Sequence, residues 1–488
     1  MVRLKINLPE YENEARALLM AFFYGKKIVS SDEPGEYSAG ITILLFKVQG
    51  GTDMVHVSAY VSGKESLSDA AECDLSDRSA TGNVMKRLLH GILSELTGRA
   101  TPWGILTGVR PSKIPMTYLE RGMSPEDSAK ELESEYLIAP ERAKMLTRLA
   151  EKERGLLSGI SFMDSWSLYA GIPFCPSICA YCSFSSFPIE KWKDEVESYI
   201  DALLKEMAAA KDMMSGRKLL TVYFGGGTPT SISSRQLYRV MEGLHRYFDL
   251  SETIELTVEA GRPDSVDLEK LKVLKDAGVG RISVNPQSMN AATLEIIGRR
   301  HSPDDVKNAF GMAREAGFDN INMDIIAGLP GEDNSHMTRT VAEIKELGPD
   351  SLTVHCLALK RASFLNQNRE KFPVAGDSEI MKMTETAREG AIELGMEPYY
   401  LYRQKNIAGN LENTGYALRG KECLYNILIM EEKQSILALG AGGSSKFVLP
   451  GTGKGPRIER VMNVKSVRDY IDRIDEMILR KEDFLGSN

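Results

Sequence analysis

Three cysteines lie within eight residues in the stretch Tyr169-Ala-Gly-Ile-Pro-Phe-Cys175-Pro-Ser-Ile-Cys179-Ala-Tyr-Cys182, with the spacing C-x3-C-x2-C. The cysteines follow the apolar segment 167–172, which predicts a strand. Three thiolates on one loop can bind three irons of an iron–sulfur cubane, and most clusters have four ligands. No other cysteine or histidine is close in sequence, so one iron would keep the open position that catalysis at a metal requires. A structural zinc ion with a distant fourth ligand is the alternative.

Strand-like and helix-like segments alternate from this stretch onward. The expected strands are 167–172, 219–224, 253–259, 280–284, 320–326 and 351–357. The helix-like segments between them are 191–214, 233–247, 267–277, 303–316 and 333–347. Such alternation is typical of βαβ units with a parallel sheet. The predicted fold class is therefore α/β, a partial, six-stranded parallel βα barrel, in which loops after the carboxyl ends of the strands carry the function.

The segments on either side of this barrel predict two further domains. At about 150 residues per domain, 488 residues suit three domains. Residues 1–160 are expected to form an N-terminal α+β domain with an accessory or substrate-covering role, because strand-like alternation there is followed by charged helical segments. The barrel is assigned to residues 161–360, and residues 361–488 to a small C-terminal α+β domain on the substrate side.

The composition argues against several classes of protein. The 60 Lys and Arg residues against 68 Asp and Glu give a net charge of −8, which offers no general electrostatic reason to expect nucleic-acid binding. No apolar run reaches about 18 residues and no secretory signal is visible, so no membrane insertion is predicted. Six cysteines are too few for a disulfide scaffold. We therefore expect a reducing cytoplasm, where clustered cysteines are metal ligands or catalysts.

The C-x3-C-x2-C motif after a first strand resembles the radical S-adenosylmethionine (SAM) superfamily. The surrounding segments GIPFCP and CAYCSF are similar to the oxygen-independent coproporphyrinogen III oxidase branch. LTGVRPSK and YYLYRQKNIAGNLENTGYA are similar to its subgroup called coproporphyrinogen dehydrogenase HemZ. This resemblance implies a 4Fe-4S cluster, held by Cys175, Cys179 and Cys182, and SAM as cofactors.

The resemblance also implies a reaction. SAM would bind the open iron, and one electron, from a donor such as a flavodoxin or ferredoxin, would cleave it to methionine and a 5′-deoxyadenosyl radical. In the family this radical abstracts hydrogen from a propionate side chain of coproporphyrinogen III. Loss of CO2 and an electron leaves a vinyl group, and two rounds give protoporphyrinogen IX.

Eight residues match positions at which the family contacts SAM: Tyr169, Gly226, Gly227, Thr228, Glu259, Gln287, Arg299 and Asp324. The Gly-Gly-Thr turn is implied to hold the SAM amino group, and Glu259 and Asp324 its hydroxyl groups. Arg299, or its neighbour Arg300, could pair with a carboxylate through two hydrogen bonds. The alternatives are a tight turn at the glycines, a packed aromatic at Tyr169, a solvated carboxylate at Glu259 and a surface arginine at Arg299.

The substrate site is expected among cations, because coproporphyrinogen carries four propionates. Lys360 and Arg361 follow the sixth predicted strand, and Arg403 and Lys405 lie in the tyrosine-rich segment 399–406. An aromatic face with interleaved cations suits a flat, anionic tetrapyrrole. A solvated basic surface, or contacts between domains, is the alternative.

Two departures from the better-known branch affect the reaction. That branch has a histidine where this chain has Gly171, and a fourth cysteine where it has Phe184. The second change resembles the heme-chaperone branch called HemW. A radical-SAM-type heme chaperone or heme-binding protein, or another radical SAM reaction on a tetrapyrrole, is therefore the alternative to coproporphyrinogen oxidation.

Overall fold

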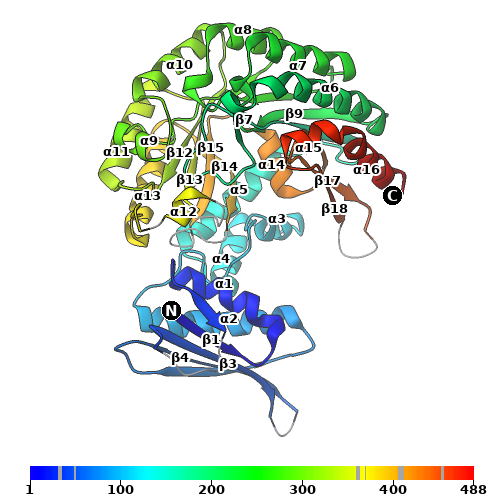
Figure 1. Cartoon of the computed structure of the whole chain (residues 1–488). Helices are drawn as coiled ribbons and strands as arrows, with labels where there is room; N and C mark the ends of the chain where they lie inside the picture. The colour runs from blue at the N-terminus through cyan, green and yellow to red at the C-terminus, as the bar shows by residue number, and fades with distance from the viewer. Residues whose placement is uncertain are drawn as a thin grey trace.

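The computed structural model describes residues 1–30, 36–48, 51–358, 363–368, 370–404, 411–451 and 456–487. An arch of helices surrounds one large sheet, and a smaller body that contains the N-terminus lies below it (Figure 1). The predicted substrate residues Lys360, Arg361 and Lys405 lie outside the described residues. Within the described part, no helix is long and apolar enough to cross a membrane.

The six strands predicted for the barrel are all present, and each pairs in parallel with the next along the chain. Their bounds are β6 Ser165–Ile172, β9 Lys218–Gly226, β10 Glu255–Glu259, β11 Arg281–Ser283, β12 Ile321–Ala327 and β13 Ser351–Cys356. A seventh parallel strand, β16 (Ser435–Leu439), pairs with β6 and was not predicted. The α/β fold class is confirmed.

Antiparallel strands extend this sheet at both edges, to eleven strands among the described residues. β15 (Glu412–Ala417) pairs with β13, and β14 (Glu397–Arg403) pairs with β15. At the other edge, β17 (Ser444–Leu449) follows β16, and β18 (Arg457–Met462) follows β17. In the described chain β14 and β18 do not pair with each other, so the sheet is open, as in a partial barrel.

The two faces of the parallel strands differ, because side chains alternate along a strand. The outer face carries fully buried apolar side chains such as Leu168, Phe224 and Met323. They belong to the core under the arc of helices in Figure 1, which are α6 Val196–Met213, α7 Ser234–Tyr247, α8 Leu268–Asp276, α10 Pro303–Glu315, α11 Asn334–Leu347 and α13 Asp377–Glu393. The inner face is polar and includes Ser167, Thr221, Thr257, Ser283, Asn322 and Thr353. Parallel sheets are usually apolar on both faces, so this polar inner face indicates a functional site.

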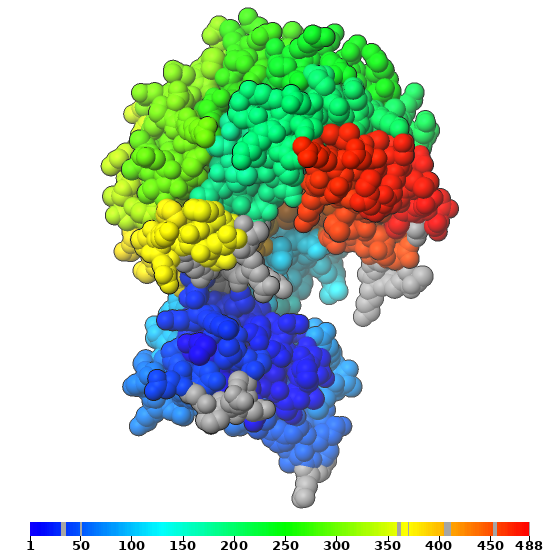
Figure 2. All heavy atoms as spheres, viewed as in Figure 1, coloured from blue at the N-terminus to red at the C-terminus, as the bar shows by residue number. Residues whose placement is uncertain are grey.

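The N-terminal body contains a five-stranded sheet with the order β2-β1-β3-β4-β5. Its strands are β1 Val2–Ile6, β2 Ile28–Ser30, β3 Ala39–Lys47, β4 Asp53–Val61 and β5 Leu67–Cys73. Helices α1 (Glu12–Phe22) and α2 (Arg78–Thr97) share a separate apolar core with this sheet. In Figure 2 this body projects from one side of the barrel.

A helical unit follows the N-terminal body, with α3 Lys113–Glu120, α4 Pro125–Tyr136 and α5 Pro140–Leu156. Its core includes Trp103 and Leu132 and also Leu401 from β14. Residues 1–160 therefore do not share a single core, and the core of the helical unit is completed by a strand of the barrel sheet.

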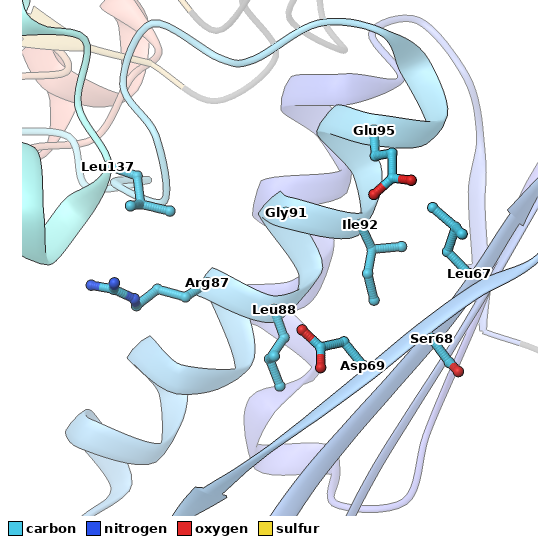
Figure 3. A pocket seen from close by; sticks show the side chains of 9 residues that line it. All are labelled: Leu67, Ser68, Asp69, Arg87, Leu88, Gly91, Ile92, Glu95 and Leu137. Atoms are coloured by element: carbon cyan, nitrogen blue, oxygen red, sulfur yellow. The ribbon is translucent and has the colours of Figure 1, made fainter.

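A hollow of about 480 Å³ lies between α2 and β5 in the N-terminal body (Figure 3). Asp69 and Glu95 contribute carboxylates to its wall, and Leu137 lines it from the helical unit. Arg87, also in the wall, donates hydrogen bonds to the carbonyls of Ser134 and Glu135 at 2.7 and 3.1 Å. Arg87 thus joins the N-terminal body to the C-terminal end of α4.

Glu432 joins the helical unit to the barrel. Its carboxylate, 5% exposed, pairs with Arg110 and, at 3.4 Å, with Lys113 of the LTGVRPSK segment. Lys446 at 3.1 Å and Arg460 at 3.2 Å approach it from β17 and β18. Although burial raises the pKa of Glu432, the hydrogen bonds and charges of Arg110 and Lys446 lower it to about 2.

We expect Glu432→Gln to lower the free energy of unfolding by about 2 kcal/mol at pH 7, because four cations lose their shared anion. The folded-state pKa is depressed, so this stabilisation is present above the ordinary value of 4.5 and is lost as the pH falls towards 2. Urea unfolding of both proteins at pH 7 and pH 3 measures the difference.

The matched control is Glu476→Gln, because Glu476 also has a pKa of about 2 and two arginine partners but is 41% exposed. We expect no measurable change for it. Equal effects of the two substitutions would show that Glu432 has no special role at the junction.

Candidate active site

The three clustered cysteines lie on the loop that follows β6, at the carboxyl end of the parallel strands. Cys175 ends the short strand β7 (Phe174–Cys175) and is buried, whereas Cys179 and Cys182 are half-buried. The Cys182 N–H donates to the Cys179 carbonyl at 3.0 Å, which folds the loop back on itself. Thr228 donates its hydroxyl to Cys175 Sγ at 3.5 Å from the end of the neighbouring strand.

The three thiols lie on one loop, where each can bind a different iron of a cubane cluster. Burial, with smaller contributions from the charges of Cys179 and Cys182, raises the pKa of Cys175 to about 11, against the hydrogen bond from Thr228. No three His, Cys, Asp or Glu side chains among the described residues converge as ligands of one metal ion. In a cubane each thiolate binds a different iron, so neighbouring but separated sulfurs are what the cluster requires.

The glycine turn after β9 packs directly against the cysteine loop. Gly226 has a φ of 107°, and a Cβ on Gly227 would lie 2.6 Å from the Phe174 carbonyl oxygen, so neither position accepts a side chain easily. The N–H groups of Gly227 and Thr228 donate to the carbonyls of Ile172 and Phe174, at 2.8 and 2.7 Å. These two N–H groups are therefore already paired within the turn. The SAM ammonium is itself a hydrogen-bond donor, so it would bind carbonyl oxygens of this turn.

Two carboxylates on the inner face differ in charge. Burial raises the pKa of Glu259 to about 7, while the Tyr223 hydroxyl donates to it at 2.7 Å. Burial also acts against ionisation of Asp324, but its pKa is lowered by His355, whose Nε2 lies 3.8 Å away, and by Asn322, which donates to it at 2.7 Å. Near neutral pH, Asp324 is therefore ionised and Glu259 is partly protonated.

Arg299 and Gln287 are fixed beside the same strand ends. Arg299 is 8% exposed and donates to the Asn285 carbonyl and, at 3.1 Å, to the Tyr181 hydroxyl, so it is not a surface arginine. Gln287 has a φ of 65°, a conformation that non-glycine residues rarely adopt. Its N–H donates to the Asp324 carbonyl at 2.9 Å, which joins the two predicted SAM contacts through the main chain.

Tyr169 lies in a stack of aromatic rings on the inner face. Its ring centroid is 6.3 Å from that of Tyr223, with 13° between the planes, and Tyr223 lies 4.6 Å from Tyr425. Tyr425 comes from α14 (Leu424–Glu431), which the sequence did not place near the barrel. The predicted SAM residues are therefore gathered at one end of one sheet face, and their individual contacts with SAM stay predictions.

Of the four predicted substrate residues, Arg403 lies within the described residues. It contacts the segment before α3. Its guanidinium donates to the Leu106 carbonyl and lies 5.2 Å from the Trp103 ring centroid. Its N–H donates to the Val109 carbonyl at 2.8 Å. This position agrees with the alternative interpretation, contacts between domains.

Two side chains meet on the inner face: His355, which the sequence did not single out, and Tyr402 of the predicted aromatic segment 399–406. His355 Nδ1 is 3.4 Å from the Tyr402 hydroxyl, and its other nitrogen faces Asp324. The signal for His355 was the period of two along β13, which places it on the same face as Ser351 and Thr353. Tyr402 was expected only as part of an aromatic face, because its approach to His355 depends on how β14 and β15 pair.

Comparison with known proteins identifies related chains. The radical SAM superfamily model matches residues 169–344. The oxygen-independent coproporphyrinogen-III oxidase-like protein HemZ of Bacillus subtilis is 40% identical, over 92% of this chain and 91% of its own. Heme chaperone HemW of Bacillus subtilis is 32% identical, over 64% of this chain and 76% of its own. The structure of coproporphyrinogen III oxidase HemN from Escherichia coli matches with a TM-score of 0.53 and 21% identity, over 67% of this chain and 73% of that chain, and shares the fold.

The cysteine loop at the end of the first parallel strand, together with the matching superfamily model, defines a radical SAM protein. Its similarity to the Bacillus subtilis protein extends over nearly the whole of both chains. The chain belongs to the HemZ family of the radical SAM superfamily. Its cofactors are a 4Fe-4S cluster and SAM.

We expect substitution of Cys175, Cys179 or Cys182 by alanine to abolish SAM cleavage, because each removes one cluster ligand. Iron content, the visible absorbance of the reconstituted protein and 5′-deoxyadenosine formation measure the loss. The control is Cys73→Ala, in the N-terminal body, which should retain all three. Retained SAM cleavage in any of the cluster variants would overturn the assignment.

We expect SAM to bind up to tenfold more tightly at pH 8 than at pH 6, because ionised Glu259 accepts hydrogen bonds from hydroxyl groups better than the acid does. Glu259→Gln should bind more weakly at pH 8 and lose this dependence. Calorimetric titration of the reconstituted proteins with SAM measures it. Glu269→Gln, on the outer surface of α8, should keep the wild-type profile, and a pH profile unchanged in Glu259→Gln would exclude Glu259.

Proposed function

We propose that the chain catalyses the oxygen-independent oxidative decarboxylation of coproporphyrinogen III to protoporphyrinogen IX. The observation that carries the proposal is the 40% identity to the HemZ protein over 461 residues. This similarity is therefore not confined to the radical SAM region, residues 169–344. The oxygen-independent coproporphyrinogen III oxidase of Escherichia coli is 30% identical over 42% of this chain. The polar inner face of the sheet is the place where the propionate-bearing substrate would bind.

Cys175, Cys179 and Cys182 would hold the cluster, which together with bound SAM would supply the 5′-deoxyadenosyl radical needed to remove hydrogen from a propionate side chain. The chain's own residues would bind SAM and the substrate and orient them. Arg299 offers a fixed positive charge beside the cysteine loop, and Asp324 and Glu259 offer hydrogen-bond acceptors at the strand ends. The stack of Tyr169, Tyr223 and Tyr425 offers an aromatic surface on the same face.

His355 supplies the protic group that Gly171 lacks. In this proposal its imidazole, held between Asp324 and Tyr402, replaces the histidine of the better-known branch on the opposite side of the inner face. The carboxylate of Asp324, 3.8 Å from Nε2, orients the ring, so that an N–H donor can face a propionate on the inner face. Lys360, Arg361 and Lys405, which lie outside the described residues, remain proposed substrate contacts.

The electron donor in this proposal is a flavodoxin- or ferredoxin-type protein, and the compartment is a reducing cytoplasm. In support, the structure contains Cys73, Cys356 and Cys423 as free thiols, in addition to the three proposed ligands.

One observation favours a second function, that of a heme chaperone. Phe184 occupies the position of the fourth cysteine of the coproporphyrinogen branch and is 72% exposed beside the cluster loop. A HemW protein is also 32% identical to this chain. A chaperone would bind heme stably and would not decarboxylate coproporphyrinogen.

The test is an anaerobic assay of the reconstituted protein with coproporphyrinogen III, SAM and dithionite, followed by product chromatography. We expect a three-propionate intermediate and then protoporphyrinogen IX, each formed with 5′-deoxyadenosine. Cleavage of SAM with no vinyl product would defeat the proposal. Stable heme binding in a parallel titration of the same protein would then favour the chaperone.

A further inference from the structure

Arg262 is a buried arginine whose guanidinium lies against the cysteine loop. It follows β10 and is 3% exposed. Its Nη1 donates to Cys179 Sγ at 3.4 Å and to the Ser177 carbonyl at 3.2 Å. Its Nη2 donates to the Ser177 hydroxyl at 3.0 Å. One edge of the guanidinium thus contacts both a proposed cluster ligand and the main chain two residues before it.

Asp264 holds the guanidinium in this orientation. Its two oxygens accept from Nε at 2.8 Å and from Nη2 at 2.6 Å, which is the bidentate geometry that fixes the guanidinium plane. The Arg262 carbonyl accepts from the N–H and the hydroxyl of Ser265, at 2.9 and 2.7 Å, so the main chain is fixed as well. The remaining edge can therefore turn only slightly away from Cys179.

A positive group that donates to a ligand sulfur changes the electron affinity of a cluster. Reduction adds negative charge, and a nearby N–H donor with a full positive charge stabilises that charge, so the reduction potential rises. Arg299 also acts on Cys179, through its charge and a hydrogen-bond interaction, while its N–H groups donate to Asn285 and Tyr181. Arg262 differs from it in donating to the sulfur at 3.4 Å while Asp264 holds its guanidinium plane.

We propose that Arg262 is a positioning residue that raises the reduction potential of the cluster by donating a hydrogen bond to Cys179, with Asp264 as its orienting partner. The proposal depends on the cluster ligands and not on the substrate. It therefore stands whether the protein oxidises coproporphyrinogen or binds heme. It was not visible in the sequence, where Arg262 stands in the unremarkable string EAGRPDS.

The experiment is an anaerobic redox titration, followed by electron paramagnetic resonance, of the full-length reconstituted protein and of Arg262→Gln, Arg262→Lys and Asp264→Asn. We compare the proteins at the potential where half of the wild-type cluster is reduced. At that potential we expect the ratio of reduced to oxidised cluster in Arg262→Gln to be about one tenth, which corresponds to a shift of the reduction potential of about −59 mV for one electron. Arg262→Lys keeps the positive charge but loses the planar guanidinium, so its reduction potential should shift less. Asp264→Asn should shift in the same direction, because the guanidinium is no longer oriented.

Arg239→Gln is the matched control, because Arg239 is also held by two carboxylates, Glu197 and Asp201, but on the outer helices. It should keep the wild-type potential. Iron content and circular dichroism show which variants retain the fold and the cluster. An unshifted potential in any Arg262 or Asp264 variant that retains its cluster overturns the proposal. A shift of equal size in Arg239→Gln also overturns it.

Discussion

The site depends on the close contact between the cysteine loop after β6 and the glycine turn after β9. Two main-chain hydrogen bonds, from Gly227 to Ile172 and from Thr228 to Phe174, hold these segments together. The contact leaves no room for a side chain at Gly227, where a Cβ would meet the Phe174 carbonyl oxygen at 2.6 Å. Because β6 and β9 are parallel neighbours, their carboxyl ends meet at one edge of the sheet, and the cysteines and the turn are presented together.

The polar inner face is costly for a parallel sheet, and the structure offsets the cost by pairing most of the buried groups. Ser167, Thr221 and Gln434 form one hydrogen-bonded set, and Asn322 joins Asp324 to Ser351 and Thr353 in another. Groups that stay unsatisfied, such as the Ser283 hydroxyl and the Asn285 side-chain oxygen, lie near the strand ends. Buried polar atoms without partners are rare in native proteins, so these positions are where a ligand would restore the missing hydrogen bonds.

The C-terminal segment stabilises the site through contacts with α6 and with the loop after β16. Lys481 of α16 (Ile474–Gly486) forms a fully buried ion pair with Glu206 of α6, and Glu206 also accepts from the Gly440 N–H at 2.8 Å. Tyr199 donates to the Gly171 carbonyl and accepts from Ala441, which ties the loop after β16 to the end of β6. Removal of one partner of such a pair leaves an uncompensated buried charge, so this contact makes the position of the cluster loop sensitive to the last helix of the chain.

The sequence by itself determined the α/β class, the six barrel strands and the cysteine loop, because hydrophobic periodicity and cysteine spacing are local properties of the chain. It also indicated the glycine turn and the carboxylates at strand ends. Only the tertiary structure placed β16 beside β6, Tyr425 in the aromatic stack, Arg262 on Cys179 and Arg403 against Trp103. These contacts join residues far apart in the chain, and a single buried arginine has no periodic pattern, so its partner is decided by the packing of the elements around it.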